Sequence, residues 1–246
     1  MDAKALSTWD HQKVHSPANQ NLLIIGGTSS LSNYICNLAI SEGWKVYCTY
    51  RDEGKRFLNK DLSWLNLDFS QYKSVNEALI FLEALQFDRI IYLAGELSNF
   101  QNDAVEFPNF SEYFTRNISM PVWFLKSLLL QKEFKVNSTF TYLSSRASEF
   151  GSNDYCYGAG KAALENLVKS FSLLNQLNLE FKIIVSGLIE GSRMYERMLP
   201  HIVEAHKNKS KGQLLSAKEA ASQIWEISSV RNLTSDLEKF KIGPEY

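Results

Sequence analysis

The chain has 246 residues, of which 45% are hydrophobic and 22% are charged, and its formal net charge is -1 at pH 7. This length and composition favour one globular domain with a sizeable core. The balanced charge implies no polyanion partner, so we expect no nucleic acid to bind.

The cysteine content and the hydropathy of the chain indicate its cellular compartment. The three cysteines occur singly, without zinc-site spacing or the even count of a secreted disulfide framework, so we expect a reducing, cytoplasmic location and no metal site. The most apolar stretch, Val122 to Leu130, is too short to span a bilayer, so we expect no membrane contact. Residues 1–20 are predicted to be a polar tail, and residues 21–246 a single domain.

Apolar runs and helical patterns alternate along the chain. Leu22–Ile25 is a continuous apolar run that ends at two glycines, which is typical of a strand buried on both faces of a parallel sheet. A helix is expected over Ser30–Glu42. Then follow strands Lys45–Tyr50 and Trp64–Leu67, helix Tyr72–Leu85, strand Arg89–Leu93, helix Phe110–Gln131, strand Thr139–Leu143, helix Tyr155–Leu177 and strand Phe181–Val185. This order predicts an α/β fold of Rossmann type, a doubly wound parallel sheet with helices on both faces.

The pattern weakens beyond Gly187. A charged helix is expected over Ser192–Lys207 and another over Ala217–Ser228, and the segment Glu190–Gly212 is placed to cover a substrate.

The turn after the first strand predicts a phosphate site. Glycines allow close approach of a ligand, and the N-terminus of the next helix offers free N–H groups, although a plain turn explains a double glycine equally well. The turn resembles that of short-chain dehydrogenases/reductases, which reads threonine-glycine-x-x-x-glycine-x-glycine. Gly27 keeps the first glycine, whereas Leu31 and Asn33 replace the others. The resemblance implies dinucleotide contacts from Gly27, Thr28, Ser29, Ser30 and Leu31.

The ends of the next strands indicate which dinucleotide binds. Arg51 stands where NAD-preferring relatives carry an acidic residue, and a guanidinium suits the 2′-phosphate of NADP. NADP is therefore the expected cofactor and NAD is less favoured. Lys55 and Arg56 either assist or form a solvated turn. The resemblance further implies cofactor contacts from Asp68, Ala94 and Gly95.

The strongest motif is Tyr157-Gly158-Ala159-Gly160-Lys161. Residues four apart share one helix face, so we expect the Lys161 ammonium to favour the Tyr157 phenolate. In relatives the tyrosine exchanges a proton with the substrate, and the lysine also holds the cofactor. The resemblance adds Ser145, with Ser144 as the alternative, as the serine that contacts the substrate carbonyl. It also adds Asn117 as the fourth catalytic residue, which would bend its helix and hold a water, although a structural role at a helix kink is the competing explanation.

These features predict an NADP-dependent carbonyl reductase or alcohol dehydrogenase with a small-molecule substrate. One alternative is a catalytically degenerate relative with a binding or regulatory role, because of Leu31 and Asn33. A second is an epimerase or dehydratase of the extended family, although the segment after Ser192 is short for its substrate domain. The resemblance implies a homodimer or homotetramer.

Overall fold

The computed structural model describes residues 20–98, 107–130, 133–174, 177–230 and 237–243. The tail predicted for residues 1–20 lies, apart from Gln20, outside the described residues.

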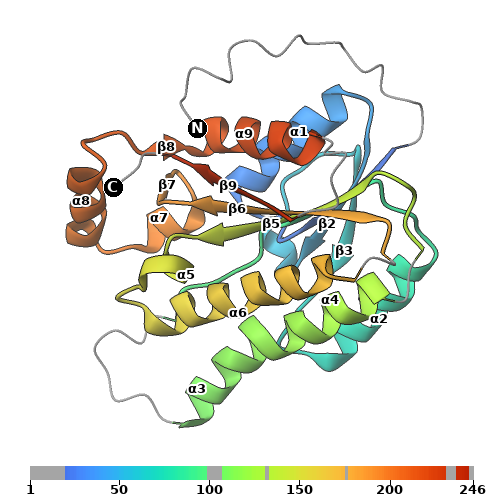
Figure 1. Cartoon of the computed structure of the whole chain (residues 1–246), viewed down its shortest axis with the longest axis horizontal. Helices are drawn as coiled ribbons and strands as arrows, with labels where there is room; N and C mark the ends of the chain where they lie inside the picture. The colour runs from blue at the N-terminus through green and yellow to red at the C-terminus, as the bar shows by residue number, and fades with distance from the viewer. Residues whose placement is uncertain (1–19, 99–106, 131–132, 175–176, 231–236, 244–246) are drawn as a thin grey trace.

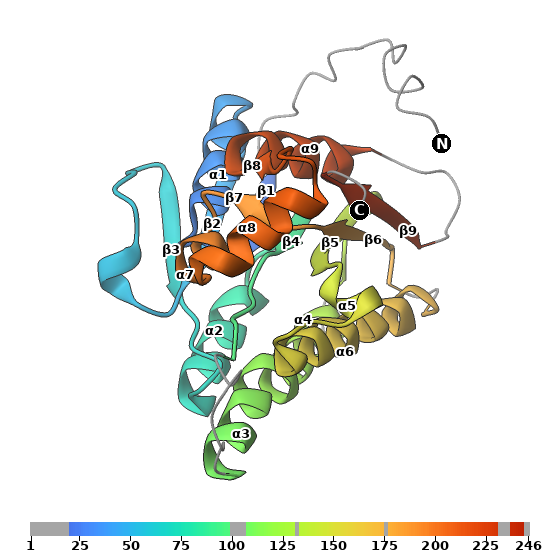
Figure 2. The ribbon, with the colours of Figure 1, turned by 90° about the vertical axis from the view of Figure 1, so that its left-hand side faces the viewer.

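Seven parallel strands form the central sheet in the order β3-β2-β1-β4-β5-β6-β9. Figure 2 views the sheet towards its carboxyl edge, with β3 on the left and β9 on the right. The order reverses direction between β1 and β4, which is the switch point of a doubly wound sheet, so the predicted fold class is confirmed. The strands are β1 Asn21–Ile25, β2 Lys45–Tyr50, β3 Leu62–Asn66, β4 Arg89–Tyr92, β5 Ser138–Ser145, β6 Leu179–Ser186 and β9 Glu238–Ile242.

Helices cover both faces of this sheet (Figure 1). α1 (Ser30–Ser41) and α9 (Ala217–Ser229) pack on one face, and α2 (Tyr72–Glu83), α4 (Met120–Leu130) and α6 (Tyr155–Ser172) on the other. In β1, Leu22 and Ile24 join the core beneath α1 and α9, while Leu23 and Ile25 join the opposite core. Burial on both faces explains why β1 is apolar at every position from Leu22 to Ile25.

The long helix predicted over Phe110–Gln131 is one continuous rod with a widened turn. It consists of α3 (Phe107–Phe114), a π-helical turn (Thr115–Ser119) and α4. The Met120 N–H donates to the Thr115 carbonyl, five residues back. Such turns are frequent at functional sites, and this one contains Asn117.

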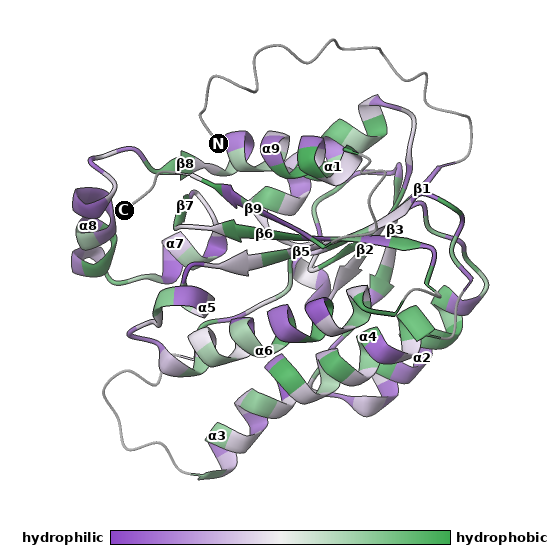
Figure 3. Cartoon of the chain, in the orientation of Figure 1, coloured by the Kyte–Doolittle hydropathy of each residue, from purple (hydrophilic) through white to green (hydrophobic). Residues whose placement is uncertain are grey.

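The chain after β6 differs from the prediction. The prediction of a single helix over Ser192–Lys207 is wrong. The segment forms two helices, α7 (Arg193–Arg197) and α8 (Pro200–Lys209). They are separate because Leu199, which precedes Pro200, has an extended backbone. α8, largely hydrophilic in Figure 3, lies beyond the carboxyl ends of the strands. The two-residue strands β7 (Ile189–Glu190) and β8 (Leu215–Ser216) pair with each other.

Smaller differences concern element ends. α6 ends at Ser172 instead of Leu177, and a further strand, β9, pairs with β6 over five residues. Two short helices, η2 (Glu53–Lys55) and α5 (Ala147–Phe150), follow β2 and β5. In the described ranges, every helix is too short or too polar to cross a bilayer.

Candidate active site

A cavity of about 260 Å³ opens at the carboxyl edge of the sheet, on the side that faces the viewer in Figure 2. Most of the predicted site residues line it: Thr28, Ser29, Leu31, Arg51, Asp68, Ala94, Gly95, Asn117, Tyr157 and Lys161. Gly27, Ser30 and Ser145 are not in its lining, although each neighbours a lining residue in the chain. The fold therefore brings most of the predicted cofactor and catalytic residues to one cavity.

The glycine turn after β1 is constrained on both sides. Gly26 has a φ of +94°, and a Cβ on it would lie 2.8 Å from the Ala94 nitrogen. Gly27 donates its N–H to the Thr49 carbonyl at 2.9 Å, and a Cβ there would lie 2.8 Å from the Cys48 Cβ. Both positions require glycine, which fixes the turn against β2 and β4.

Residues at the N-terminus of α1 line the cavity next to this turn. Ser29 caps the helix by accepting from the Ser32 N–H at 3.1 Å, and Ser32 returns the contact. Leu31, which replaces the second family glycine, is 5% exposed and packs in the core beneath α1 and α9. The Ser30 hydroxyl donates to the Gly191 carbonyl, which joins α1 to the segment before α7.

Asp154 fixes the start of α6 and hence Tyr157. Its buried carboxylate accepts from the Tyr157 N–H at 2.9 Å and from the N–H and hydroxyl of Ser98 at 2.6 and 2.5 Å. One side chain thus joins the helix carrying the tyrosine to the segment after β4.

Tyr157 and Lys161 are both buried, and their electrostatics differ from the prediction. Burial raises the pKa of Tyr157 to about 12, partly offset by a hydrogen bond with Ser145. Burial lowers the pKa of Lys161 to about 8. The Lys161 Nζ donates to the Leu143 carbonyl at 2.9 Å and the Ala94 carbonyl at 3.3 Å, and lies 5.9 Å from the centroid of the Tyr157 ring. In this structure the Lys161 ammonium hydrogen-bonds carbonyl groups. Burial therefore raises the pKa of Tyr157 more than the ammonium was expected to lower it.

The two serines at the end of β5 have different partners. Ser145 hydrogen-bonds Tyr157 and accepts from the Ala147 N–H at 3.2 Å. Ser144 donates to the Glu165 carboxylate at 2.8 Å, inside the protein. Ser145 is thus the candidate that contacts Tyr157, whereas Ser144 is the candidate that lines the cavity.

Asn117 lies on the π-helical turn and lines the cavity. Its Nδ2 donates to the Tyr113 carbonyl at 3.0 Å, four residues back, and the Tyr113 hydroxyl donates to the Glu96 carbonyl at 2.8 Å. The asparagine is thus linked to the segment after β4.

The charged residues at the adenosine end divide into two groups. Lys55 pairs with Asp52 at 2.8 Å and Arg56 with Glu53, which matches the solvated-turn interpretation of these two cations. Arg51 instead pairs across the cavity, with its Nη1 2.9 Å from Glu96 Oε2. The structure thus adds Glu96, which lines the cavity and which sequence reasoning missed.

Asp68 stands at the other side of Arg51, after β3. Its carboxylate accepts from the Ser70 N–H at 2.9 Å and the Ser70 hydroxyl at 2.7 Å. Asp68 thereby organises the turn before α2 while it lines the cavity.

The sheet order, the glycine turn and the Tyr157/Lys161 helix define this protein as a short-chain dehydrogenase/reductase. The sequence model described as the NAD dependent epimerase/dehydratase family matches residues 22–223, so the chain belongs to this family. The match extends through α8 and into α9.

Solved structures with the same fold share little sequence with the chain. A dehydrogenase/reductase from Sinorhizobium meliloti 1021 has a TM-score of 0.75 at 19% identity, over 92% of this chain and 95% of its own. The NADP complex of RhlG from Pseudomonas aeruginosa has a TM-score of 0.76 at 19% identity, over 93% and 96%. BdcA in complex with NADPH has a TM-score of 0.74 at 15% identity, over 90% and 93%. No curated protein sequence matches the chain.

Proposed function

We propose that the protein is an NADP-dependent oxidoreductase that interconverts a carbonyl and an alcohol on a small molecule. The observation that carries the proposal is that Tyr157 and Lys161 line one cavity that continues to Arg51, with Ser145 beside the tyrosine. The relatives RhlG and BdcA, whose structures hold NADP and NADPH, support this choice of cofactor.

The chemical end supplies a proton donor and an oxygen-binding group. With a pKa of about 12, Tyr157 is protonated at neutral pH and donates its proton to the substrate oxygen in the direction of reduction. Ser145 hydrogen-bonds the same oxygen and so polarises the carbonyl. Asn117, held by Tyr113, supports return of the proton to the phenol. A bound NADPH supplies the hydride in this chemistry.

The donors along the cavity fit a nicotinamide dinucleotide. Thr28, Ser29 and the N–H groups of α1 would hold the pyrophosphate, and Arg51 the 2′-phosphate. Asp68 and Ala94-Gly95 would line the adenosine, and Lys161 would hold the nicotinamide ribose.

Cofactor binding decides between this enzyme and the degenerate alternative, which Leu31 motivates because it lines the phosphate end of the cavity. We expect NADPH to bind more tightly than NADH in a titration followed by nicotinamide fluorescence, and Arg51→Ala to weaken NADPH selectively. If neither cofactor binds wild-type protein or any of its variants, the binding or regulatory alternative replaces the enzyme.

The family match favours a second activity, epimerisation or dehydration of a nucleotide sugar, because the same tyrosine and lysine can serve it. After Ser192 the described part of the chain holds α7, α8, α9 and the two strands β8 and β9, and of these α9 and β9 pack on the Rossmann sheet itself. A carbonyl substrate screen alongside nucleotide sugars separates the two activities.

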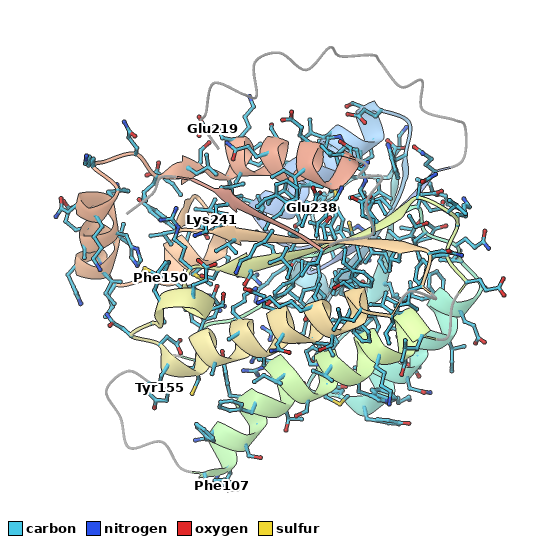
Figure 4. The ribbon with its side chains drawn as sticks, viewed as in Figure 1. Phe107, Phe150, Tyr155, Glu219, Glu238 and Lys241 are labelled. Carbon is cyan, nitrogen blue, oxygen red and sulfur yellow. The ribbon has the colours of Figure 1, made fainter. Side chains whose placement is uncertain are left out.

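We also propose a cytoplasmic homodimer or homotetramer. The three cysteines are unbridged in the structure, including Cys36 and Cys48, whose sulfur atoms lie 3.2 Å apart, and this fits a reducing compartment. Phe107 on α3 and Tyr155 on α6 are 77% and 55% exposed, and Figure 4 shows both at the outer ends of these helices. Exposed aromatic side chains are typical of interfaces. Light scattering after gel filtration tests this, and a monomer at micromolar concentration contradicts it.

A further inference from the structure

Glu96 is surrounded by three arginines from three separate elements. Its carboxylate lies 2.9 Å from Arg51 after β2, 3.3 Å from Arg197 at the end of α7 and 3.6 Å from Arg116 on the π-helical turn. All four side chains line the same cavity. These contacts hold the pKa of Glu96 below its ordinary value although burial opposes ionisation, so Glu96 is an anion at neutral pH.

The ion pair with Arg51 crosses the groove. β1 lies between β2 and β4 in the sheet, and the glycine turn follows β1. Arg51 follows β2 and Glu96 follows β4, so their contact spans the space above that turn. The adenosine half of a dinucleotide would lie in this space. Glu96 already forms an ion pair with the Arg51 guanidinium, which a 2′-phosphate would need as its partner.

We propose that Glu96 sets the selectivity between cofactors with and without a 2′-phosphate, by competing with that phosphate for Arg51. This rests on the proposed function. A 2′-phosphate must displace the carboxylate from Arg51 and then bears its repulsion, whereas a 2′-hydroxyl meets neither penalty. Glu96 therefore lowers the affinity for NADPH and leaves that for NADH nearly unchanged.

The other two arginines make this exchange feasible. When Glu96 releases Arg51, it keeps Arg116 and Arg197 as partners, so its charge stays compensated. The side chain of Arg51 is 39% exposed, so breaking its pair costs little compared with a buried pair. Glu96 thus acts as an internal substitute for the phosphate.

Glu96→Gln tests the proposal because it keeps the shape and removes the charge. We expect NADPH to bind about fivefold more tightly to this variant, the size of an exposed ion pair, and NADH to change by less than about twofold. Adenosine 2′,5′-bisphosphate and 5′-AMP, used as competitors, should show the same contrast without the nicotinamide. In an Arg51→Ala background, Glu96→Gln should have no selective effect.

Glu112→Gln is the matched control, because Glu112 also pairs with Arg116, at 3.7 Å, while the contacts described for Arg51 do not include it. We expect it to leave both affinities unchanged. If NADPH binds wild type and Glu96→Gln equally, the inference is overturned while the proposed function stands. If no cofactor binds any variant, the proposed function fails, and the inference with it. If only Glu96→Gln binds NADPH, both are supported.

Discussion

Gly95 leaves just enough room for Lys161. A Cβ on Gly95 would lie 2.9 Å from the Lys161 Nζ and 3.0 Å from its Cε, closer than a carbon atom can approach. The absence of a side chain at position 95 thus permits the ammonium to reach the carbonyls of Leu143 and Ala94.

Gly95→Ala should therefore impair activity more than stability. The added methyl displaces the end of a flexible side chain, so we expect the free energy of unfolding to change by less than about 1 kcal/mol. Turnover should fall at least about tenfold because the ammonium leaves its position beside Tyr157. Gly54→Ala, whose Cβ would have only an ordinary contact at 3.5 Å, is the control. Equal activity of both variants contradicts this role of Gly95.

Tyr157→Phe should abolish turnover without loss of cofactor. The phenol supplies the proton in our proposal, and a positioned acid contributes about 100-fold to 10,000-fold in rate. NADPH affinity should change by less than about twofold, because the ring remains. Tyr155→Phe, two residues away and 55% exposed, serves as the control for the helix. Full activity of Tyr157→Phe would contradict the assignment of Tyr157 as the proton donor.

Most of the fold follows from the sequence. The apolar runs of β1 and β2 and the helical spacing of α1 and α2 predicted these elements to within a few residues, because each buries a wide face. A bend at Asn117 was expected, but its π-helical form was not, because the residues around it read as ordinary helix. The division at Pro200 was missed although the proline was visible.

The site was predicted less completely, since its electrostatics arise between distant segments. Tyr157 and Lys161 share a local motif and were found, but their pKa shifts depend on burial that the motif does not contain. Glu96 was missed because Arg51 and Arg197 are far from it in the chain. Ser144 and Ser145 could be told apart only through Glu165 and Tyr157.

Asp154 should be important for both folding and activity. Asp154→Ala removes the acceptor for the Tyr157 N–H and both Ser98 contacts, so we expect a loss of about 1–3 kcal/mol in unfolding free energy. Asp154→Asn keeps one oxygen and should recover part of it. Urea denaturation of both variants measures this, and an unchanged midpoint for Asp154→Ala argues against the role.

Glu165 should make stability depend on acid. Although burial opposes ionisation, hydrogen bonds from Lys239, Lys169 and Ser144 hold its pKa at about 2, below the ordinary 4.5. The folded protein then binds fewer protons than the unfolded chain between these values, so this contribution is full above pH 4.5 and is lost as pH falls towards 2.

The Glu165→Gln variant isolates that contribution. We expect it to be less stable than wild type at pH 7 by about 1–3 kcal/mol, with the difference shrinking as pH falls from 4.5 to 3. Thermal unfolding across this range measures it. Glu77→Gln, on the exposed surface of α2, is the control. If the difference in stability between wild type and Glu165→Gln stays constant with pH, Glu165 is not the source of the acid dependence.

The central place of β1 affects how the protein is made. β1 pairs with β2 on one side and β4 on the other, so its second edge stays open until Arg89–Tyr92 has left the ribosome. Until then a nascent chain presents an apolar strand, uncovered along one edge, to its neighbours in the polysome. Chaperone capture of such chains is most valuable in the interval between synthesis of β2 and synthesis of β4.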